Sequence, residues 1–363
     1  MENPFLVTSP NGYKYIDNNC SINKMVIAKV PVKGIDDSIE GKAVSEIFST
    51  SVIVEKVKEC ADRLEIPPNT PTEHLPFMLL ELMNSENKQV SDCANEIAVL
   101  FGKRLGLIFL TLKTALPQNK KVRADWDEKH WQYWQNIENI ITVGGLTSGK
   151  FGKVIIDEAQ KVCNLNSKPV YKITAFENAS HVGVMGCTKL LGNYDGISIV
   201  MDFGQTNMKR SIIEHKNGEI IRMENLPSIP SKYMQWNIEN SDEKEKQARL
   251  LHKYIVNAVS DAYSKAKKLG SVGSDIIISI ANYTFNGVLD SNRGGYAKLS
   301  VLYKNYAEYL SNELSSVIKA PVNVRLIHDG TAVALNFINY KNSICVTLGT
   351  FLGVGFTDIF GDF

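Results

Sequence analysis

The segment MDFGQTNMK (201–209) combines residue types that suit phosphate binding. Asp202 ends an apolar run, Gly204 and Thr206 follow in a short turn, and Lys209 lies on the returning strand. We expect a tight hairpin whose backbone N–H groups and Thr206 hydroxyl face an oxyanion, because glycine lets the backbone approach closely. Asp202 would then hold Mg²⁺ through water beside the phosphates. The alternative is an ordinary hairpin with an acid and a glycine in its turn.

A second glycine-rich hairpin is predicted near the C-terminus. The run LGTFLGVGF (348–356) has the pattern strand, turn, strand, with Gly349 and Thr350 in the turn. Such a hairpin could clamp phosphates from the opposite side, although glycine-rich hairpins also form for steric reasons alone.

Between these hairpins, a predicted strand delivers His328 and Asp329 to a helix that opens with the small residues GTAVA. An Asp at a strand-to-helix junction is either an N-cap or a catalytic carboxylate. The position of Asp329 between two candidate phosphate sites favours the catalytic role.

A third strand-then-glycine feature is GGLTSGK, residues 144–150. It matches the start of a P-loop, but residue 151 is Phe where a P-loop has the Ser or Thr that binds Mg²⁺. We therefore do not expect a true P-loop here.

The apolar patterning predicts an α/β fold in which strands alternate with helices. Helices are expected over five segments: 52–64, 90–116, 127–137, 242–269 and 302–318. A strand is expected over 322–327. Four aromatic residues, Trp126, Trp131, Tyr133 and Trp134, suit core packing better than a carbohydrate-stacking platform, since they recur at helical spacing beside an apolar helix.

The three motifs together resemble the ROK and hexokinase-like sugar kinases of the actin-like ATPase superfamily. DFGQTNMK looks like the family's first phosphate motif, HDGTAVAL like the segment with the catalytic Asp, and LGTFLGVGF like the second phosphate motif. The resemblance implies a two-domain actin-like ATPase (ribonuclease-H-like) fold with an interdomain cleft. Gln205 replaces the family's usual second glycine, and the ROK zinc signature and the Gly-Glu-x-Gly-His sugar motif are absent.

The order of the motifs implies a circular permutation, because the family's adenosine motif follows its second phosphate hairpin and here precedes it. Residues 1–192 would supply the family's C-terminal, adenosine-binding part, and 193–330 its N-terminal domain with the first phosphate hairpin. Residues 331–363 would add the second hairpin and complete the large domain with 1–192.

The resemblance implies ATP- and Mg²⁺-dependent transfer of the γ-phosphoryl group to a hydroxyl of a sugar or sugar-like acceptor. Asp329 would be the general base and Asp202 would order the metal. The implied nucleotide and phosphate ligands are Gly204, Thr206, Lys209, Gly349, Thr350, Gly144 and Gly145. His328 and Glu46 are candidates for substrate binding. The alternative is a catalytically weak nucleotide- or sugar-binding sensor or scaffold of the same fold.

Composition limits the partners. The 363 residues carry a net charge of +1, which gives neither nucleic acid nor an anionic membrane an electrostatic footprint. The N-terminus lacks the features of a secretory signal, and the six cysteines form no CxxC pair, so we expect a cytoplasmic protein with reduced, buried cysteines. A small-molecule substrate and a possible homodimer, as in many relatives, complete the expectation.

Overall fold

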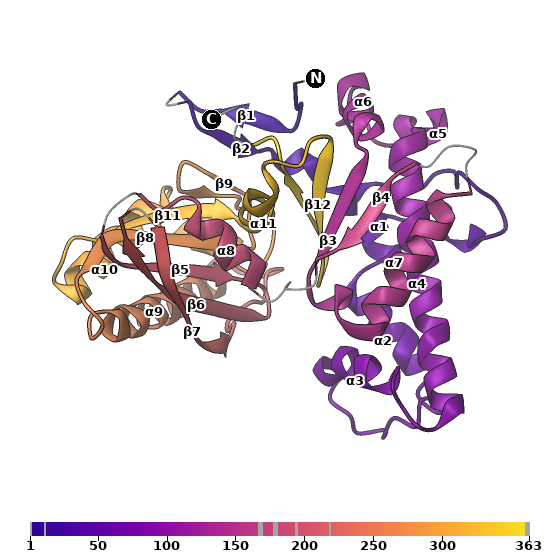
Figure 1. Cartoon of the computed structure of the whole chain (residues 1–363), viewed down its shortest axis with the longest axis horizontal. Helices are drawn as coiled ribbons and strands as arrows, with labels where there is room; N and C mark the ends of the chain where they lie inside the picture. The colour runs from indigo at the N-terminus through magenta and orange to yellow at the C-terminus, as the bar shows by residue number, and fades with distance from the viewer. Residues whose placement is uncertain are drawn as a thin grey trace. The chain divides into compact units, whose positions relative to one another are not determined.

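The computed structural model describes residues 2–10, 12–165, 170–176, 181–192, 195–217 and 219–359. The chain forms two compact units and crosses between them several times along its length. Unit 1 consists of Met1–Phe5, Asn18–Ser180 and Asn339–Asp358, and unit 2 of Leu6–Asp17, His181–Ile338 and Ile359–Phe363. Each unit contains one main β-sheet with helices packed on it (Figure 1).

The five-stranded sheet of unit 2 has the strand order β11-β8-β5-β6-β7. Its strands are β5 (Gly196–Phe203), β6 (Asn207–Lys216), β7 (Glu219–Pro230), β8 (Val272–Ile280) and β11 (Asn323–His328). The first three form an antiparallel meander, and β8 and β11 then add in parallel on the other side of β5. Three antiparallel strands followed by two parallel crossovers is the ribonuclease-H-like arrangement, so the α/β, actin-like fold class is confirmed.

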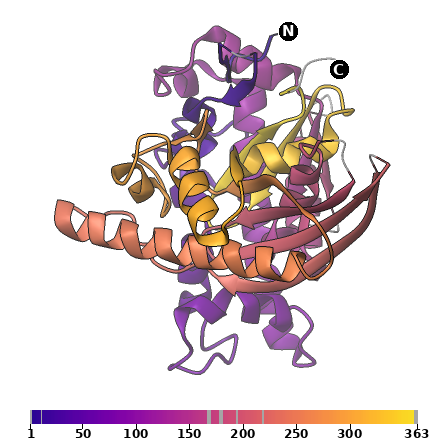
Figure 2. The same ribbon diagram turned by 90° about the vertical axis from the view of Figure 1, so that its left-hand side faces the viewer.

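Helices cover both faces of this sheet because its central strands are apolar on both sides. On one face, alternate residues of β5, β8 and β11 pack against α9 (Ser241–Ala266) and α10 (Tyr306–Ile318). Figure 2 shows α9 as the long helix that crosses the sheet. On the other face, Val200, Ile277 and Ile327 pack against α8 (Val182–Thr188) and α11 (Asp329–Ala334).

The sheet of unit 1 combines two strands from the middle of the chain with two from its C-terminal part. Its order is β13-β12-β3-β4, formed by β3 (Asn139–Val143), β4 (Lys172–Ala175), β12 (Ser343–Leu348) and β13 (Leu352–Phe356). The C-terminal hairpin β12–β13 is antiparallel, and β12 runs parallel to β3 from Ser343 opposite Asn139 to Thr347 opposite Val143. The C-terminal hairpin thus completes a sheet whose other strands lie some 200 positions earlier in the sequence.

Helices of unit 1 pack closely where glycine permits it. They are α1 (Val44–Ile47), α2 (Thr50–Glu59), α3 (Leu75–Leu82), α4 (Lys88–Thr114), α5 (Pro117–Lys121), α6 (Glu128–Asn136) and α7 (Gly149–Cys163). A Cβ at Gly102 or Gly106 of α4 would lie 2.6 Å from a Cβ of α7, in Glu158 or Val162 respectively. The two glycines, one turn apart, therefore set the distance between α4 and α7.

We expect Gly106→Val to destabilise unit 1 by about 1–3 kcal/mol, since the new side chain overlaps α7 backbone as well as Val162. Thermal unfolding against the matched surface variant Gln89→Val, on the exposed start of the same helix, measures the effect. Equal unfolding temperatures for the two variants would show that the helices are not held at this spacing.

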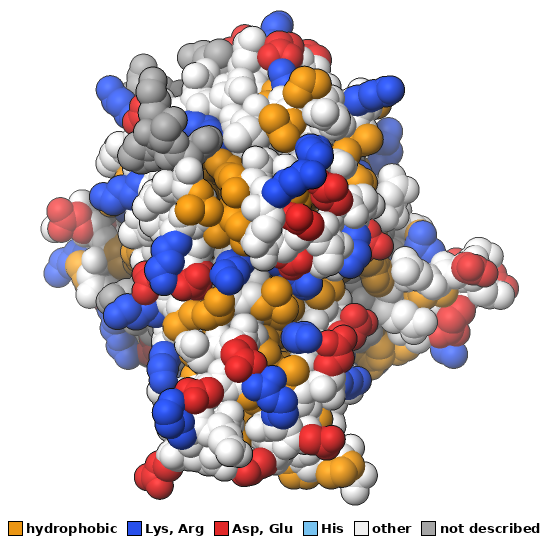
Figure 3. Space-filling model, turned by 90° about the vertical axis from the view of Figure 1, so that its right-hand side faces the viewer, with side chains coloured by type: hydrophobic (Ala, Val, Ile, Leu, Met, Phe, Trp, Pro, Cys, Tyr) orange, Lys and Arg blue, Asp and Glu red, His pale blue; other side chains and the backbone are white. Residues whose placement is uncertain are grey.

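The remaining strands are short. In unit 2, β1 (Leu6–Thr8) pairs with β2 (Lys14–Ile16), and β9 (Thr284–Phe285) pairs with β10 (Val288–Leu289), both antiparallel. The six cysteines are free, and only Cys60 is not buried. No helix among the described residues is both long and apolar enough to span a membrane. On the face drawn in Figure 3, positive and negative side chains are interspersed.

Two features of the predicted organisation differ from the observed units. The predicted boundaries after 192 and 330 lie near, but not at, the passages between units, so α8 and the segment up to Ile338 belong to unit 2. The N-terminal hairpin β1–β2 also belongs to unit 2, although it was assigned with residues 1–192. The equivalence of each part to a half of a permuted relative stays a prediction. Residues 193–194, directly after the first predicted boundary, lie outside the described part.

Candidate active site

The carboxyl ends of three neighbouring parallel strands of unit 2 bring together polar side chains. In the sheet register, Asp202 on β5 lies opposite Ser279 on β8, and Ser279 lies opposite Ile327 on β11. Ser279 Oγ donates a hydrogen bond to Asp202 Oδ1 over 2.9 Å, and Lys209 Nζ on β6 lies 3.5 Å from Asp202 Oδ2. Asp202 is only 15% exposed, so the serine and the lysine stabilise a carboxylate that is largely removed from water.

Asp329, the first residue of α11, follows the last strand of this row. Its Oδ1 accepts a hydrogen bond from the backbone N–H of Gly330 over 2.7 Å. Burial, and then the negative charge of Asp202, raise the pKa of Asp329 to about 7, and Arg293 acts in the opposite direction. The side chain nevertheless keeps 38% of its surface exposed, so the carboxyl lies in a protein-lined recess that solvent reaches. A carboxyl group with this pKa is able to exchange protons near neutral pH.

His328 lies beside the Asp329 carboxylate, at the preceding position in the sequence. Burial, and next the positive charge of Arg293, lower the pKa of His328 to about 3, so the ring is neutral at pH 7. Nδ1 accepts the backbone N–H of Thr331 and caps α11, which assigns the proton to Nε2, 3.2 Å from Asp329 Oδ1. The ring also stacks on Tyr283 with a centroid distance of 4.6 Å. Nδ1 is thus occupied within the protein, and a role of His328 in substrate binding stays a prediction.

The turn of the β5–β6 hairpin is held by the rest of unit 2. Gly204 O accepts hydrogen bonds from Ser231 Oγ (2.7 Å) and Tyr296 OH (2.9 Å), and Ser231 N donates to Thr206 O (2.8 Å). Gln205, which departs from the family pattern, donates to Ala281 O and accepts from the N–H of Gly295. The Thr206 side chain is exposed and its hydroxyl has no hydrogen-bond partner among the residues that the structure describes.

Unit 1 brings together the other two glycine motifs. At the ends of β3 and β12, Gly144 has a φ of +113°, and a Cβ there would lie 2.3 Å from Leu348 O. A Cβ at Gly145 would meet nothing within 4 Å. In the β12–β13 turn, Thr50 at the start of α2 donates its hydroxyl to Gly349 O (2.9 Å) and its N–H to Thr350 O (3.3 Å). Glycine is therefore required at position 144 for steric reasons, whereas a side chain at position 145 would have space.

We expect Gly144→Ala to destabilise unit 1, because the new methyl group would overlap a carbonyl oxygen and the backbone conformation is unfavourable for alanine. Gly145→Ala should leave the unfolding temperature unchanged and weaken nucleotide binding if this motif approaches the nucleotide. Thermal unfolding with and without Mg²⁺–ATP checks both variants. A Gly145→Ala protein that binds ATP as the wild type does would remove this residue from the nucleotide site.

Two other sequence candidates take part in local structure. Glu46 Oε2 accepts the backbone N–H of Ala43 (2.7 Å) and so caps the short helix α1. Lys150, within the P-loop-like run, donates to Met83 O over 2.7 Å. The assignment of Glu46 to substrate binding stays a prediction.

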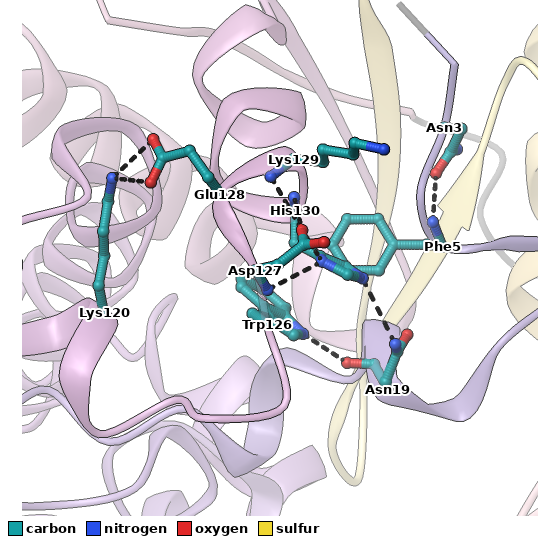
Figure 4. Close-up of polar contacts among 9 residues, drawn as sticks. All are labelled: Asn3, Phe5, Asn19, Lys120, Trp126, Asp127, Glu128, Lys129 and His130. Atoms are coloured by element: carbon teal, nitrogen blue, oxygen red, sulfur yellow. Dashed lines mark hydrogen bonds and ion pairs between the residues drawn. The ribbon is translucent and has the colours of Figure 1, made fainter.

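The aromatic cluster is part of the core of unit 1, which confirms the packing interpretation. All four residues, Trp126, Trp131, Tyr133 and Trp134, are buried. Figure 4 shows the polar contacts around them: Trp126 Nε1 donates to Asn19 O, and Asp127 caps α6 through Lys129 N and His130 N. The His130 ring lies 2.7 Å from the Asp127 carboxylate, with Phe5 at its edge.

A divalent cation would find few protein ligands in the site. In the described part of the chain, no three His, Cys, Asp or Glu side chains are grouped to hold a metal. Asp202 offers carboxylate oxygens at the carboxyl ends of the parallel strands, and Asp329 is close enough for the charge of Asp202 to raise its pKa. Mg²⁺ is usually held by one or two carboxylates together with substrate phosphates, so these residues fit Mg²⁺ in the presence of a phosphate ligand.

Sequence reasoning missed several residues of this site. Ser279 is a lone hydroxyl at the end of an apolar strand, which is a weak signal. Arg293, whose charge acts on both His328 and Asp329, lies in the long segment between β8 and α10. Gly183 of α8 permits the closest approach, because a Cβ there would lie 2.9 Å from the Asp202 carboxyl carbon. No local pattern predicts these tertiary contacts.

Comparison with known proteins gives distant likenesses. No family model matches the chain, and no curated protein matches it. Among solved structures, the type II variant of the Aquifex aeolicus Ppx/GppA phosphatase is 10% identical over 64% of this chain and 82% of its own, with a TM-score of 0.31. Another structure, of the Aquifex aeolicus Ppx/GppA family member, is 11% identical over 39% of this chain and 40% of its own, with a TM-score of 0.20.

The predicted sugar kinase is contradicted by this comparison. The two structures are described as Ppx/GppA proteins, the first of them as a phosphatase, and neither is a ROK or hexokinase-like kinase. The ROK family and phosphoryl transfer to a sugar are therefore withdrawn, whereas the coarser actin-like ATPase fold stands on the sheet topology. At these TM-scores the likenesses assign no activity to this chain, which has to be argued from its own residues.

Proposed function

We propose that unit 2 carries an Mg²⁺-dependent phosphohydrolase site that transfers a terminal phosphoryl group from a phosphoanhydride to water. The observation that carries the proposal is the pair of neighbouring carboxyl groups with different environments. Asp202 is stabilised by Ser279 and Lys209, whereas the pKa of Asp329 is raised to about 7. Environments that separate two carboxyl groups in this way assign different chemical roles to them.

Asp329 is the general base in this proposal. A base with a pKa near the working pH combines a sufficient ionised fraction with a strong tendency to take the proton. Oδ1 of Asp329 accepts the Gly330 N–H and lies 3.2 Å from His328 Nε2, so Oδ2 is the oxygen left to accept the proton of an attacking water. His328 is a positioning residue, because it caps the start of α11, the helix that begins with Asp329.

The phosphates would lie against Asp202, the β5–β6 turn and two basic side chains. When bound, Mg²⁺ neutralises phosphate charge, and Asp202 is the residue that would hold it, directly or through water. Lys209, beside Asp202, and Arg293, whose charge acts on Asp329, supply positive charge. The exposed Thr206 hydroxyl is a donor for a phosphate oxygen.

The substrate class follows from this site, whereas the choice of nucleotide rests on unit 1. Gly144, Gly145, Gly349 and Thr350 remain our candidates for contacts to a nucleotide, so ATP is the first substrate to test. Linear tripolyphosphate offers the same anhydride without a base or a ribose. A higher kcat/KM for ATP than for tripolyphosphate is expected if the unit 1 motifs contribute.

Release of inorganic phosphate from Mg²⁺–ATP and Mg²⁺–tripolyphosphate, with no alcohol added, tests the proposal. We expect turnover that requires Mg²⁺ and that is lost in Asp329→Asn but retained in the matched surface variant Asp242→Asn. Binding of either substrate without release of phosphate by the wild type would refute hydrolysis. Release that persists in Asp329→Asn would refute the assignment of the base.

A further inference from the structure

A cavity of about 380 Å³ in unit 2 borders the candidate active site and shares His328 with it. It is enclosed by the β1–β2 hairpin, by strand β11 and by the start of α10. Its volume falls within the range of about 300–1,000 Å³ that is typical of small-molecule sites. Nothing in the proposed hydrolysis uses it.

The cavity exists because the β1–β2 hairpin lies over the edge strand of the sheet but does not pair with it. β11 is an end strand, and the β1–β2 hairpin forms a separate sheet beside it. Two edge groups of β11 are bonded to side chains instead: Val324 N donates to Ser311 Oγ (2.9 Å), and Leu326 O accepts from Thr284 Oγ1 (3.5 Å). An uncapped edge would invite another strand, and here side chains occupy it and leave a space under the hairpin.

The lining of the cavity is positively charged. Among the described residues of the lining, Lys14 and Arg325 are cationic and Glu308 is the one acid. No carboxylate of the described ranges lies within 4.0 Å of either cation, and Glu308 likewise forms no ion pair there. The Arg325 guanidinium is 5.0 Å from the centre of the Tyr13 ring, which orients it without neutralising it. Such a guanidinium pairs well with a planar or tetrahedral oxyanion.

Amide groups provide further donors in the same wall. Asn286 Oδ1 accepts a hydrogen bond from Tyr15 OH over 2.7 Å, and Asn305 Oδ1 accepts from Glu308 N at the start of α10. In both residues the amide oxygen accepts a hydrogen bond from the protein. The two NH₂ groups are free to donate, because neither has an acceptor in the described part of the chain. Donors beside cations again favour a ligand rich in oxygen.

The cavity also touches the residues that position the proposed base. His328 and Thr331 line it, and the same His328 ring approaches Asp329 Oδ1 at 3.2 Å while it caps α11 through Thr331 N. A molecule in the cavity would therefore contact the side chain that orients Asp329.

We propose that this cavity is a second ligand site, which binds a small organic anion through pairing of its carboxylate or phosphate with Arg325 and hydrogen bonds from Asn286 and Asn305. Lys14 adds charge at the hairpin. The anion would lie against His328, so its binding is coupled to the position of Asp329. The binding itself rests on the cavity alone and does not depend on the proposed hydrolysis.

Titration calorimetry without divalent cations tests the proposal, with glycerol 3-phosphate and citrate as probes and glycerol as the neutral control. We expect saturable binding of at least one anion and none of glycerol, which also distinguishes a phosphate from a carboxylate ligand. Arg325→Gln should weaken binding about 10-fold or more, since a charge-assisted hydrogen-bond pair is lost. The affinity of Arg325→Lys should lie between those of the wild type and Arg325→Gln, because lysine keeps the positive charge but lacks the paired N–H donors of a planar guanidinium.

The matched control is Arg249→Gln, an exposed arginine on α9, which should bind as the wild type does. Thermal unfolding without probe checks that each variant is folded. Failure of both anions to bind the folded wild type would overturn the proposal, and so would equal affinity in Arg325→Gln. Either result leaves the hydrolase proposal untouched, because metal, nucleotide and turnover are absent from the measurement.

Discussion

Asp329→Asn should lower the rate of phosphate release by about 10²–10⁴-fold, the usual contribution of a general base. The amide has the shape of the carboxyl group and keeps an oxygen that accepts the Gly330 N–H, so the start of α11 is expected to remain intact. Binding of the Mg²⁺-bound substrate should therefore change far less than kcat. Parallel losses in binding and turnover would instead mean that Asp329 holds the substrate.

The pH dependence tests the same residue in a second way. Because the pKa of Asp329 is about 7, the wild-type rate should rise with pH up to about 7 and level off above it. Stability has the opposite trend. The unfolded chain ionises this group near its ordinary pKa of 3.8, so the stability it contributes is complete below that pH and is lost as pH rises through about 7.

The unfolding temperature of the wild type should therefore fall relative to that of Asp329→Asn as pH increases from 4 to 8. Scanning both proteins over this range, in one buffer system at constant ionic strength, measures the difference directly. Curves that stay parallel would show that Asp329 ionises in the folded protein as it does in the unfolded chain.

Asp202→Asn is expected to have the second largest effect. Loss of the carboxylate should raise the Mg²⁺ concentration needed for half-maximal activity by at least about 10-fold, by the scale of metal-site substitutions. The rate at saturating Mg²⁺ should also fall, since phosphate charge is then less well neutralised. Activity measured across a Mg²⁺ series gives both quantities.

The same variant changes the base in a way that a merely structural defect would not. The negative charge of Asp202 helps to raise the pKa of Asp329, so Asp202→Asn should move the midpoint of the pH–rate profile below 7. Ser279→Ala, which removes only the hydrogen bond to Asp202, is the matched variant and should show a smaller loss. An unchanged midpoint and an unchanged Mg²⁺ requirement would contradict the shared site.

Local patterns in the sequence were sufficient for the elements and for the two carboxylates. The apolar periodicity of 242–269 and 90–116 corresponds to α9 and α4, because one continuous apolar face requires one helix. Asp202 and Asp329 stand at strand ends, and parallel strands bring such ends to one edge of a sheet. Their closeness in the fold was therefore predictable from the sequence, whereas the general-base role of Asp329 was implied by the family resemblance.

Tertiary contacts were not predictable in the same way. Gln205 departs from the family pattern at the phosphate turn, and its amide is bonded to Ala281 and Gly295, which are distant in the sequence. Arg293 and Gly183 act on the carboxyl pair from segments with no local motif. The sugar kinase was wrong for a related reason: glycine hairpins describe how phosphate is held, and the residues that choose an acceptor lie in loops without a fixed pattern.

The central claim is that water attacks the terminal phosphoryl group with Asp329 as the base. The most direct measurement is turnover of Mg²⁺–ATP or Mg²⁺–tripolyphosphate in ¹⁸O-labelled water. Phosphorus NMR then detects ¹⁸O in the released phosphate by its isotope shift. We expect one ¹⁸O atom in each phosphate that the wild type releases, and no labelled phosphate above background for Asp329→Asn. Phosphate released without the label, or labelled equally by both proteins, would contradict it.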